Sequence, residues 1–440
     1  ELPDVLVCQA NDAGTVLRAG PFGPGNGAGL DLHAVHGWAL WSPGSIESTA
    51  SVKASQLPSF LVRYASAHGP ALVDELGSYG TSEGVAAGYQ RAAGAAAIAA
   101  GALGVLAWCW QDIASTAPPY DSRPAERAAG LVRLDGTARP ALGALADTAR
   151  LAALLAEFTP DPEPVAIYRP ELAGTAGSSY LDPSAGTLAM YFASLLLHRA
   201  GFPHRVAAGD AGAARLLMVP AAGRLTLADH ARLRDHLSHG GTVYLSVADH
   251  ISGLPDPELT GVQPVDFALG PDERSRGRMR WTGDDTGGAA DVQWLLDWTR
   301  LPARYARVEP TTARVLATFD DGSAACTSND VGPGRFVVVT FPVELQLDRP
   351  GALEATGWDA LYARIAALAG LPSVQKAAPT VEALPGTIAG QAAVVLINHG
   401  TTAAELPGPL PGGGDPLTVP AKGWLVATSA GVRAQAGGAR

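Results

Sequence analysis

Short apolar runs alternate with helical patterns over the first third of the chain. Four of these runs predict strands, at residues 4–10, 30–38, 70–77 and 101–110. Two Ala-rich stretches predict helices, at residues 82–101 and 140–158. Strands that alternate with helices are typical of parallel βα units. We therefore predict that residues 1–158 form an α/β domain built on a parallel sheet.

Two further regions follow a proline-rich break. The segment TPDPEP, residues 159–164, holds three prolines, which remove backbone donors and restrict their neighbours, so it predicts a linker. From 165 to 372, strands again alternate with helices and predict a small doubly wound sheet. Asp321-Gly322 within this region predicts a hairpin turn. Residues 380–440 are β-patterned with turns rich in Gly and Pro, and predict a small antiparallel sandwich.

Composition narrows the class of protein. The 440 residues are enough for two or three domains, and 47% apolar with 17% charged residues is a globular profile. The net charge of −11 and the lack of any basic run argue against a nucleic-acid partner. No apolar run is long enough to span a membrane. The chain begins with Glu1 and enters a strand almost at once, so we expect it to start inside a domain.

The cysteines indicate the compartment. Cys8, Cys109 and Cys326 lie far apart with no CxxC spacing, which argues against a disulfide framework or a structural zinc site. A reducing, cytoplasmic location is therefore expected. We expect no metal and no cofactor.

The third predicted strand ends on two carboxylates. In ALVDELG, residues 71–77, strand alternation places Asp74 and Glu75 on opposite faces. Parallel α/β barrels keep their active sites at the carboxyl ends of the strands. Glu75 is then the last inward residue and a candidate catalytic group, and Asp74 is expected to point toward the helix layer. The alternative is that Glu75 is a surface or helix-capping carboxylate.

Aromatic and histidine side chains end the neighbouring strands. His36 and Trp38 end the second strand, and Trp108 and Trp110 share one face at the end of the fourth. A tryptophan there suits stacking on the C–H face of a sugar, and ordinary core packing is the alternative, favoured for Trp110. His36 is placed to orient a nearby carboxylate. His33 falls on the opposite face, so the two histidines are not expected to share a metal.

The order of the motifs AVHGW, LVDELGSYG and GVLAWCWQD resembles the second half of a clan A glycoside hydrolase barrel. In that clan a His-x-aromatic motif, a nucleophilic glutamate and a sugar-stacking tryptophan end strands six, seven and eight. The resemblance implies that Glu75 is the nucleophile. It also implies a substrate-binding role for His36, Trp38, Trp108 and Trp110. The VDELG motif is similar to that of family five enzymes, mannanases and mannosidases among them.

The later regions resemble family forty-two β-galactosidases and a subgroup of family five β-mannosidases. In those enzymes a flavodoxin-like or amidotransferase-like domain precedes a small β domain, and in family forty-two it mediates trimerisation. The stretch from RVLATFDDG to VVVTFPVE looks like that domain's hairpin, turn and strand. The resemblance implies three parts: the C-terminal half of a (β/α)8 TIM barrel at 1–158, a flavodoxin-like trimerisation domain at 165–372 and a small antiparallel β domain at 380–440.

The middle region lacks the motifs of an enzyme of its own. Neither G-x-C-x-G nor G-x-S-x-G follows the strand at 242–247. Ser246, Asp249 and His250 are too close in sequence to form a catalytic triad. Assembly is therefore the predicted role of this region, and the resemblance to family forty-two enzymes implies that the assembly is a homotrimer.

A retaining glycosidase needs a second carboxyl group about 5–5.5 Å from the nucleophile. In clan A this is a glutamate that follows an asparagine, but residues 1–158 contain no Asn-Glu pair, and Glu83 is a poor substitute. The resemblance therefore implies that a preceding segment or another chain completes the barrel and supplies the acid/base. Three hypotheses stay open: a retaining β-glycosidase acting on β-mannosides, a β-galactosidase of the family forty-two type, and a non-catalytic carbohydrate-binding or assembly module.

Overall fold

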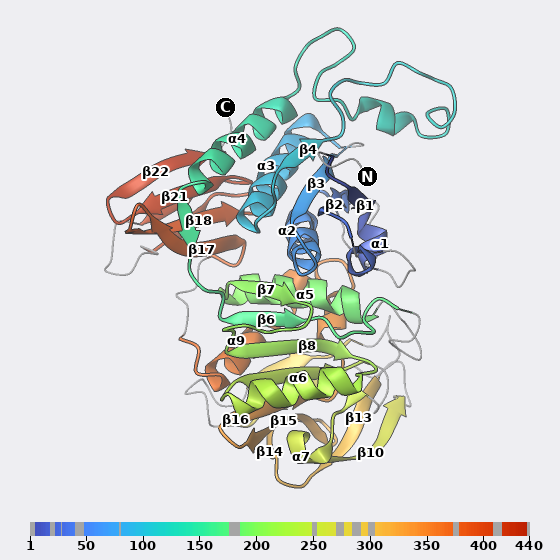
Figure 1. The fold of residues 1–440 in the computed structure, drawn as a ribbon, viewed down its shortest axis with the longest axis vertical. Helices are drawn as coiled ribbons and strands as arrows, with labels where there is room; N and C mark the ends of the chain where they lie inside the picture. The colour runs from blue at the N-terminus through green and yellow to red at the C-terminus, as the bar shows by residue number, and fades with distance from the viewer. Residues whose placement is uncertain are drawn as a thin grey trace. The chain divides into compact units, whose positions relative to one another are not determined.

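The computed structural model describes residues 5–17, 23–27, 29–39, 48–78, 81–175, 185–248, 253–269, 277–283, 292–297, 304–372, 378–407 and 416–437. The chain forms two compact units, most of whose elements are labelled in Figure 1. Unit 1 comprises residues 1–16, 22–161 and 375–440, and unit 2 comprises residues 17–21 and 162–374. The division into the three predicted domains stays a prediction.

Four parallel strands form the sheet that carries the candidate site. They lie in the order β1 (Cys8–Asn11), β2 (Leu32–Gly37), β3 (Ala71–Leu76) and β4 (Val105–Ala107). Each pairs with its neighbour in parallel, which confirms the predicted parallel sheet. Strand β4 has three residues, far fewer than the ten of the apolar run that predicted it. Closure of this sheet into a barrel stays a prediction.

The helices of unit 1 are α1 (Ala13–Leu17), α2 (Val52–Ser66), α3 (Glu83–Ala99) and α4 (Pro140–Leu155). The last two confirm the predicted helices, whereas α2 was not predicted. Helix α2 begins at Ser51, whose side chain accepts a hydrogen bond from the backbone N–H of Ala54. All its residues from 52 to 65 are buried, including the polar Lys53, Gln56 and Arg63, and Pro58 lies in its interior.

The C-terminal residues form antiparallel sheets, as predicted. A five-stranded sheet has the order β22 (Gly431–Ala436), β21 (Trp424–Thr428), β18 (Gln391–Asn398), β17 (Val381–Ile388) and β5 (Phe158–Pro160). Strands β19 (Ala404–Leu406) and β20 (Leu417–Val419) form a second, two-stranded sheet. Strand β5 corrects the prediction that residues 159–164 are only a linker. Pro160 is tolerated there because β5 is an edge strand.

The two faces of the five-stranded sheet are covered by different elements. One face packs on α3 and α4, in an apolar cluster that includes Ala95, Leu151 and Trp424. The other face packs against β19 and β20, through residues such as Leu396, Leu406 and Val419. Figure 1 shows both helices beside this sheet. The C-terminal sheets therefore belong to the same compact unit as the parallel sheet.

A buried polar chain joins α2 to the C-terminal sheet. The Nζ of Lys422 donates to the Oγ of Ser55 over 3.2 Å and to the carbonyl of Ser51 over 3.3 Å. Ser55 Oγ lies 3.0 Å from Nδ1 of His399, whose Nε2 lies 3.3 Å from a carboxylate oxygen of Glu382. Burial lowers the pKa of His399. Burial also lowers the pKa of Lys422, from 10.5 to about 8.

We expect Lys422→Met to remove a pH dependence of stability at alkaline pH. Because the folded pKa of Lys422 is depressed, the unfolded chain binds the extra proton between about pH 8 and 10.5. The free energy of unfolding of the wild type should therefore gain a contribution that rises across this window and is lost as the pH falls through 8. Urea unfolding of both proteins from pH 7 to 10.5 measures the difference. A constant difference across the window would contradict the shift.

Unit 2 is built on a nine-stranded mixed sheet. Its order is β12 (Gln293–Leu295), β11 (Arg278–Trp281), β14 (Arg314–Phe319), β15 (Ala324–Val331), β16 (Gly334–Val339), β9 (Thr242–Val247), β8 (Leu216–Ala222), β6 (Val165–Tyr168) and β7 (His204–Ala207). The strands from β16 to β7 in this order are parallel, and the others are antiparallel. The predicted hairpin at Asp321-Gly322 is confirmed as the β14–β15 pair.

The remaining elements of unit 2 surround this sheet. The helices are α5 (Ala185–Ala200), α6 (Leu227–Ser238), α7 (Pro257–Thr260), α8 (Ala352–Ala355) and α9 (Asp359–Leu368). Strands β10 (Val262–Leu269) and β13 (Arg304–Pro310) pair as a separate antiparallel ribbon. Among the described helices of the whole chain, none is long and apolar enough to cross a membrane.

One carboxyl group is fully buried in unit 2. Glu344 accepts hydrogen bonds from the hydroxyls of Tyr244, Ser246 and Tyr362 at 2.6, 2.6 and 2.7 Å. Burial raises the pKa of Glu344. Ser246 also accepts a bond from the backbone N–H of Ala221. These contacts hold Ser246 inside the core and give it a structural role.

Candidate active site

Glu75 lies at the carboxyl end of β3, beside two side chains from the end of β2. The indole Nε1–H of Trp38 donates a 2.9 Å hydrogen bond to Oε2 of Glu75. Nδ1 of His36 lies 3.7 Å from the same oxygen. His36 lies opposite Glu75 in the register of the two parallel strands. The side chain of Glu75 is 26% exposed, so a ligand can reach the carboxylate.

His36 also contacts Asp74. Its Nε2 lies 3.4 Å from Oδ2 of Asp74, so the imidazole is flanked by two carboxylates. The hydrogen bond that His36 donates to Asp74 is the largest influence raising the pKa of His36, and burial acts in the opposite sense. Asp74 was expected to point toward the helix layer, and this was wrong. The register of β2 against β3 shifts between Val35 and His36, which lets His36 meet both carboxylates.

We expect Asp74→Asn to lower the pKa of His36. The neutral amide removes both the hydrogen bond and the negative charge that favour the imidazolium. An NMR titration of the His36 ring protons measures the change. Asp12→Asn is the matched control, because Asp12 raises the same pKa less than Asp74 does. An equal fall in both variants would contradict the assigned role of Asp74.

A glycine lets the ends of β2, β3 and β4 meet. A Cβ atom at Gly77 would lie 2.7 Å from the carbonyl oxygen of Trp108 and closer still to the indole of Trp38. The backbone N–H of Trp108 donates to the carbonyl of Leu76 over 3.1 Å. Gly77 therefore permits the close approach that places Trp38 against Glu75.

The two tryptophans that follow β4 differ in exposure. Trp108 is half-buried and is joined to Cys109 by a cis peptide bond. Trp110 is 67% exposed, so core packing, the alternative favoured for it, is wrong. The contacts of Trp108 named above are made by its backbone. A sugar-stacking role for either ring stays a prediction.

Glu83 has a structural explanation. Both its carboxylate oxygens accept from Arg133, at 2.6 and 2.7 Å, and Arg139 donates to one of them over 2.5 Å. Arg139 also donates to Asp112 over 2.6 Å. This network ties the start of α3 to the segment that follows Trp110. The carboxylate of Glu83 thus pairs with two guanidinium groups. This pairing supports the expectation that Glu83 does not serve as the acid/base.

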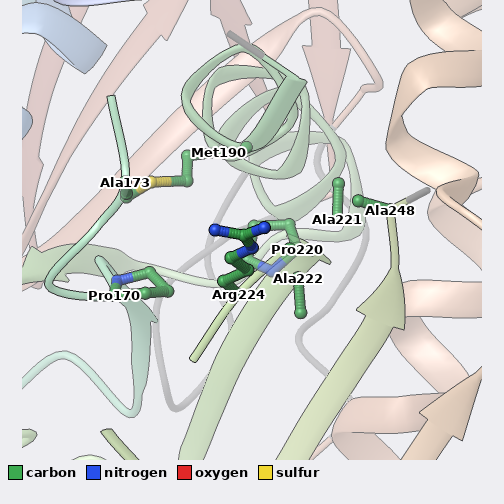
Figure 2. Close-up of a pocket in the computed structure, with 10 residues that line it drawn as sticks. Pro170, Ala173, Met190, Pro220, Ala221, Ala222, Arg224 and Ala248 are labelled. Atoms are coloured by element: carbon green, nitrogen blue, oxygen red, sulfur yellow. The ribbon is translucent and has the colours of Figure 1, made fainter. Parts of the chain in front are cut away.

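A small pocket of about 20 Å³ lies in unit 2, at the carboxyl ends of its parallel strands (Figure 2). Figure 2 shows Arg224 among apolar side chains that include Met190, Pro170 and Pro220. Arg224 is the one ionisable group among the described residues of the lining. Of the three residues considered as a triad, Ser246 is buried, and Asp249 and His250 lie outside the described residues.

Metal ligands do not cluster in the part of the chain that the structure describes. No group of three or more His, Cys, Asp or Glu side chains is placed there to hold an ion. His33 is buried and packs edge-on against His68.

Comparison with known proteins places this geometry in context. No family model and no curated protein matches the chain. An exo-β-1,4-mannosidase from Opitutaceae bacterium strain TAV5 matches with a TM-score of 0.64 and 23% identity, over 82% of this chain and 66% of that one. A family 42 β-galactosidase from G. stearothermophilus matches with a TM-score of 0.65 and 16% identity, over 90% and 59%. A β-galactosidase from Halorubrum lacusprofundi matches with 0.65 and 17%, over 95% and 62%.

Over the aligned part, the chain shares the fold of these three glycosidases. The resemblance to β-mannosidases and family 42 β-galactosidases that the sequence predicts is thus confirmed at the level of structure. The chain spans between 59% and 66% of the length of these three proteins. At such low identities the similarity establishes the fold and leaves the activity to be tested.

Proposed function

We propose that this chain carries the nucleophile of a retaining β-glycosidase, with β-mannosides as its substrates. The observation that carries the proposal is the environment of Glu75. Its carboxylate lies at the carboxyl end of a parallel strand, accepts a hydrogen bond from Trp38 and faces His36. Such strand ends are where parallel α/β barrels hold their active sites. The fold of the chain supports the same reaction class.

The chemistry follows a double displacement. A carboxylate oxygen of Glu75 attacks the anomeric carbon, and the bond from that carbon to the leaving-group oxygen breaks. The leaving-group oxygen takes a proton from a second carboxylic acid. Water, deprotonated by that second group, then releases the sugar from Glu75 with net retention. The hydrogen bond from Trp38 and the contact with His36 hold the carboxylate of Glu75 in position for the first step. We assign substrate contacts to His36, Trp38, Trp108 and Trp110.

We propose that further parallel strands, from a preceding segment or another chain, complete a barrel and supply the acid/base. Strands β1 and β4 are the outer strands of the sheet, and each pairs on one side within the described residues. Apolar side chains are exposed beside both, among them Leu6 at 72% and Leu103 at 64%. Unpaired apolar edges of this kind invite pairing with another strand. The similar glycosidases have longer chains, which is consistent with such an addition.

Unit 2 is proposed to mediate assembly, as a trimer. The pocket at its strand ends offers no nucleophile among the described residues, and Ser246 is committed to buried hydrogen bonds. Light scattering during size-exclusion chromatography tests the proposal. A mass of three chains supports it, and a monomer at micromolar concentration contradicts it.

A β-galactosidase of the family 42 type is the second candidate, because family 42 structures align over about 90% of this chain, against 82% for the mannosidase. A panel of aryl β-glycosides, with NMR of the first anomer released, separates the candidates. The protein is assayed with any segment that precedes residue 1 in its reading frame. Faster release from mannosides with retention supports the proposal, and preference for galactosides favours the second candidate. No turnover of any glycoside favours a non-catalytic binding or assembly module.

A further inference from the structure

A second cleft lies in unit 1, between α3, α4 and the C-terminal sheet. Its volume is about 930 Å³, within the range of ligand-binding sites. The first three turns of both helices form one wall, and residues around β21 and β22 form the other. None of Glu75, His36, Trp38 and Trp108 lines it. The cleft is therefore a site distinct from the candidate active site.

Two helical glycines that line the cleft have no packing explanation. Gly84 in α3 and Gly143 in α4 both face open space. A Cβ atom added at either position would meet no atom within 4 Å. Glycine favours a helix less than alanine does. The absent side chains leave helix backbone accessible from the cleft. A ligand that approaches the backbone closely accounts for both glycines.

The charge of the cleft is locally positive. Arg91 Nε and an Nη of Arg150 bind the two oxygens of Asp147, at 2.7 and 2.6 Å. Two guanidinium groups thus share one carboxylate. Lys422 lines the wall opposite, but its Nζ is bound to Ser51 and Ser55, so the positive charge of the cleft comes from the two arginines. The Nη atoms of Arg91 make no hydrogen bond to another described residue in this arrangement. This surplus is local, because the chain as a whole carries −11.

We propose that this cleft binds an acidic oligosaccharide, whose carboxylates pair with Arg91 and Arg150. Guanidinium groups bind carboxylates with two parallel hydrogen bonds, which a neutral sugar does not offer. None of the described residues that line the cleft is aromatic, so the stacking that recognises neutral sugar rings is not provided there. The volume accommodates several rings rather than a lone anion. The choice of a carbohydrate rests on the proposed function, whereas the choice of an anion rests on the cleft alone.

Isothermal titration calorimetry of the whole protein tests the proposal with three probes: a tetra-uronate, the same oligomer with its carboxyls reduced to alcohols, and inorganic phosphate. We expect the uronate to bind, and added NaCl to weaken it. Arg91→Met should raise its Kd about tenfold or more, because charge-assisted hydrogen bonds are lost. Asp147→Asn should lower the Kd, because it removes the negative charge that both guanidinium groups now share. Arg433→Met is the matched control, since Arg433 pairs with Glu157 outside the cleft.

Gly143→Ala separates binding from folding. This substitution should raise thermal stability, because alanine favours the helix, and yet weaken uronate binding by filling the cleft. Equal affinity for the reduced oligomer, or an unchanged Kd in Arg91→Met, would overturn the proposal. Phosphate binding as tightly as the uronate would identify a simple oxyanion site and overturn the carbohydrate part. Hydrolysis of aryl glycosides is scored separately, so failure at Glu75 and failure at this cleft are distinguishable.

Discussion

Glu75→Gln is expected to lower the kcat for aryl β-glycosides by roughly 10⁴-fold or more, because it removes the group that forms the covalent intermediate. Glutamine has the same shape and still accepts the hydrogen bond from Trp38, so the fold should persist. Initial rates with a dinitrophenyl glycoside measure the effect. That leaving group needs little acid assistance, so the assay reports on the nucleophile alone.

Chemical rescue gives the control for this loss. In Glu75→Ala, azide can enter the space of the missing carboxylate and attack the anomeric carbon, which gives a glycosyl azide of inverted configuration. Rescue by azide together with an unchanged circular dichroism spectrum would assign the loss to chemistry rather than unfolding. A Glu75→Gln variant that keeps turnover within a few-fold of the wild type would place the nucleophile elsewhere.

Gly77→Ala is expected to damage the site and the fold together. The added methyl group would collide with the Trp38 indole and with the backbone oxygen of Trp108. The backbone of Trp108 cannot rotate away as a side chain can. The Trp38 indole must therefore move, and its hydrogen bond to Glu75 is lost. We expect a loss of about 1–3 kcal/mol in the free energy of unfolding, as for other overpacked positions. A fall in kcat of at least tenfold should accompany it, because Glu75 loses its hydrogen bond.

Gly104→Ala is the matched control for Gly77→Ala. Gly104 immediately precedes β4 in the same sheet, but a Cβ there would meet only Leu72, at an ordinary distance of 3.4 Å. Urea unfolding and aryl glycoside kinetics should show little change in this variant. Equal losses at both glycines would mean that the sheet tolerates no added methyl group, and the specific role of Gly77 would fail.

Local patterns predicted the parallel sheet of unit 1 well. Apolar runs that end on polar or aromatic residues located β2 and β3, and alanine-rich periodicity located α3 and α4. Helix α2 was not predicted, because nearly all of it is buried and Pro58 interrupts the helical pattern of its sequence. Strand β5 was not predicted, because Pro160 was interpreted as part of a linker. An edge strand tolerates this proline.

Contacts between residues far apart in the chain could not be predicted from the sequence. The pairing of Ser55 with His399 joins positions 344 residues apart, and no local pattern indicates it. The packing of α3 and α4 on the C-terminal sheet is of the same kind. Each local segment is compatible with several tertiary partners. Side-chain packing in the complete fold decides which partner it contacts.

The candidate site was predicted in part. Strand ends placed His36, Trp38 and Glu75 near one another, and the structure brings these three side chains into contact. The contact between Asp74 and His36 was missed because strict alternation was assumed through a register shift. A glycine two residues after Glu75 was a signal of close approach that only the positions of Trp38 and Trp108 explain.

Trapping of the glycosyl-enzyme tests directly whether Glu75 is the nucleophile. The protein is incubated with a 2-deoxy-2-fluoro-mannoside that carries a dinitrophenyl leaving group, and its peptides are mapped by mass spectrometry. We expect one fluoromannosyl adduct, on the peptide that contains Glu75, and none in Glu75→Gln. An adduct from the galacto analogue alone would transfer the assignment to a β-galactosidase. An adduct on a different carboxylate, or no adduct from either sugar, would contradict the claim that Glu75 is the nucleophile.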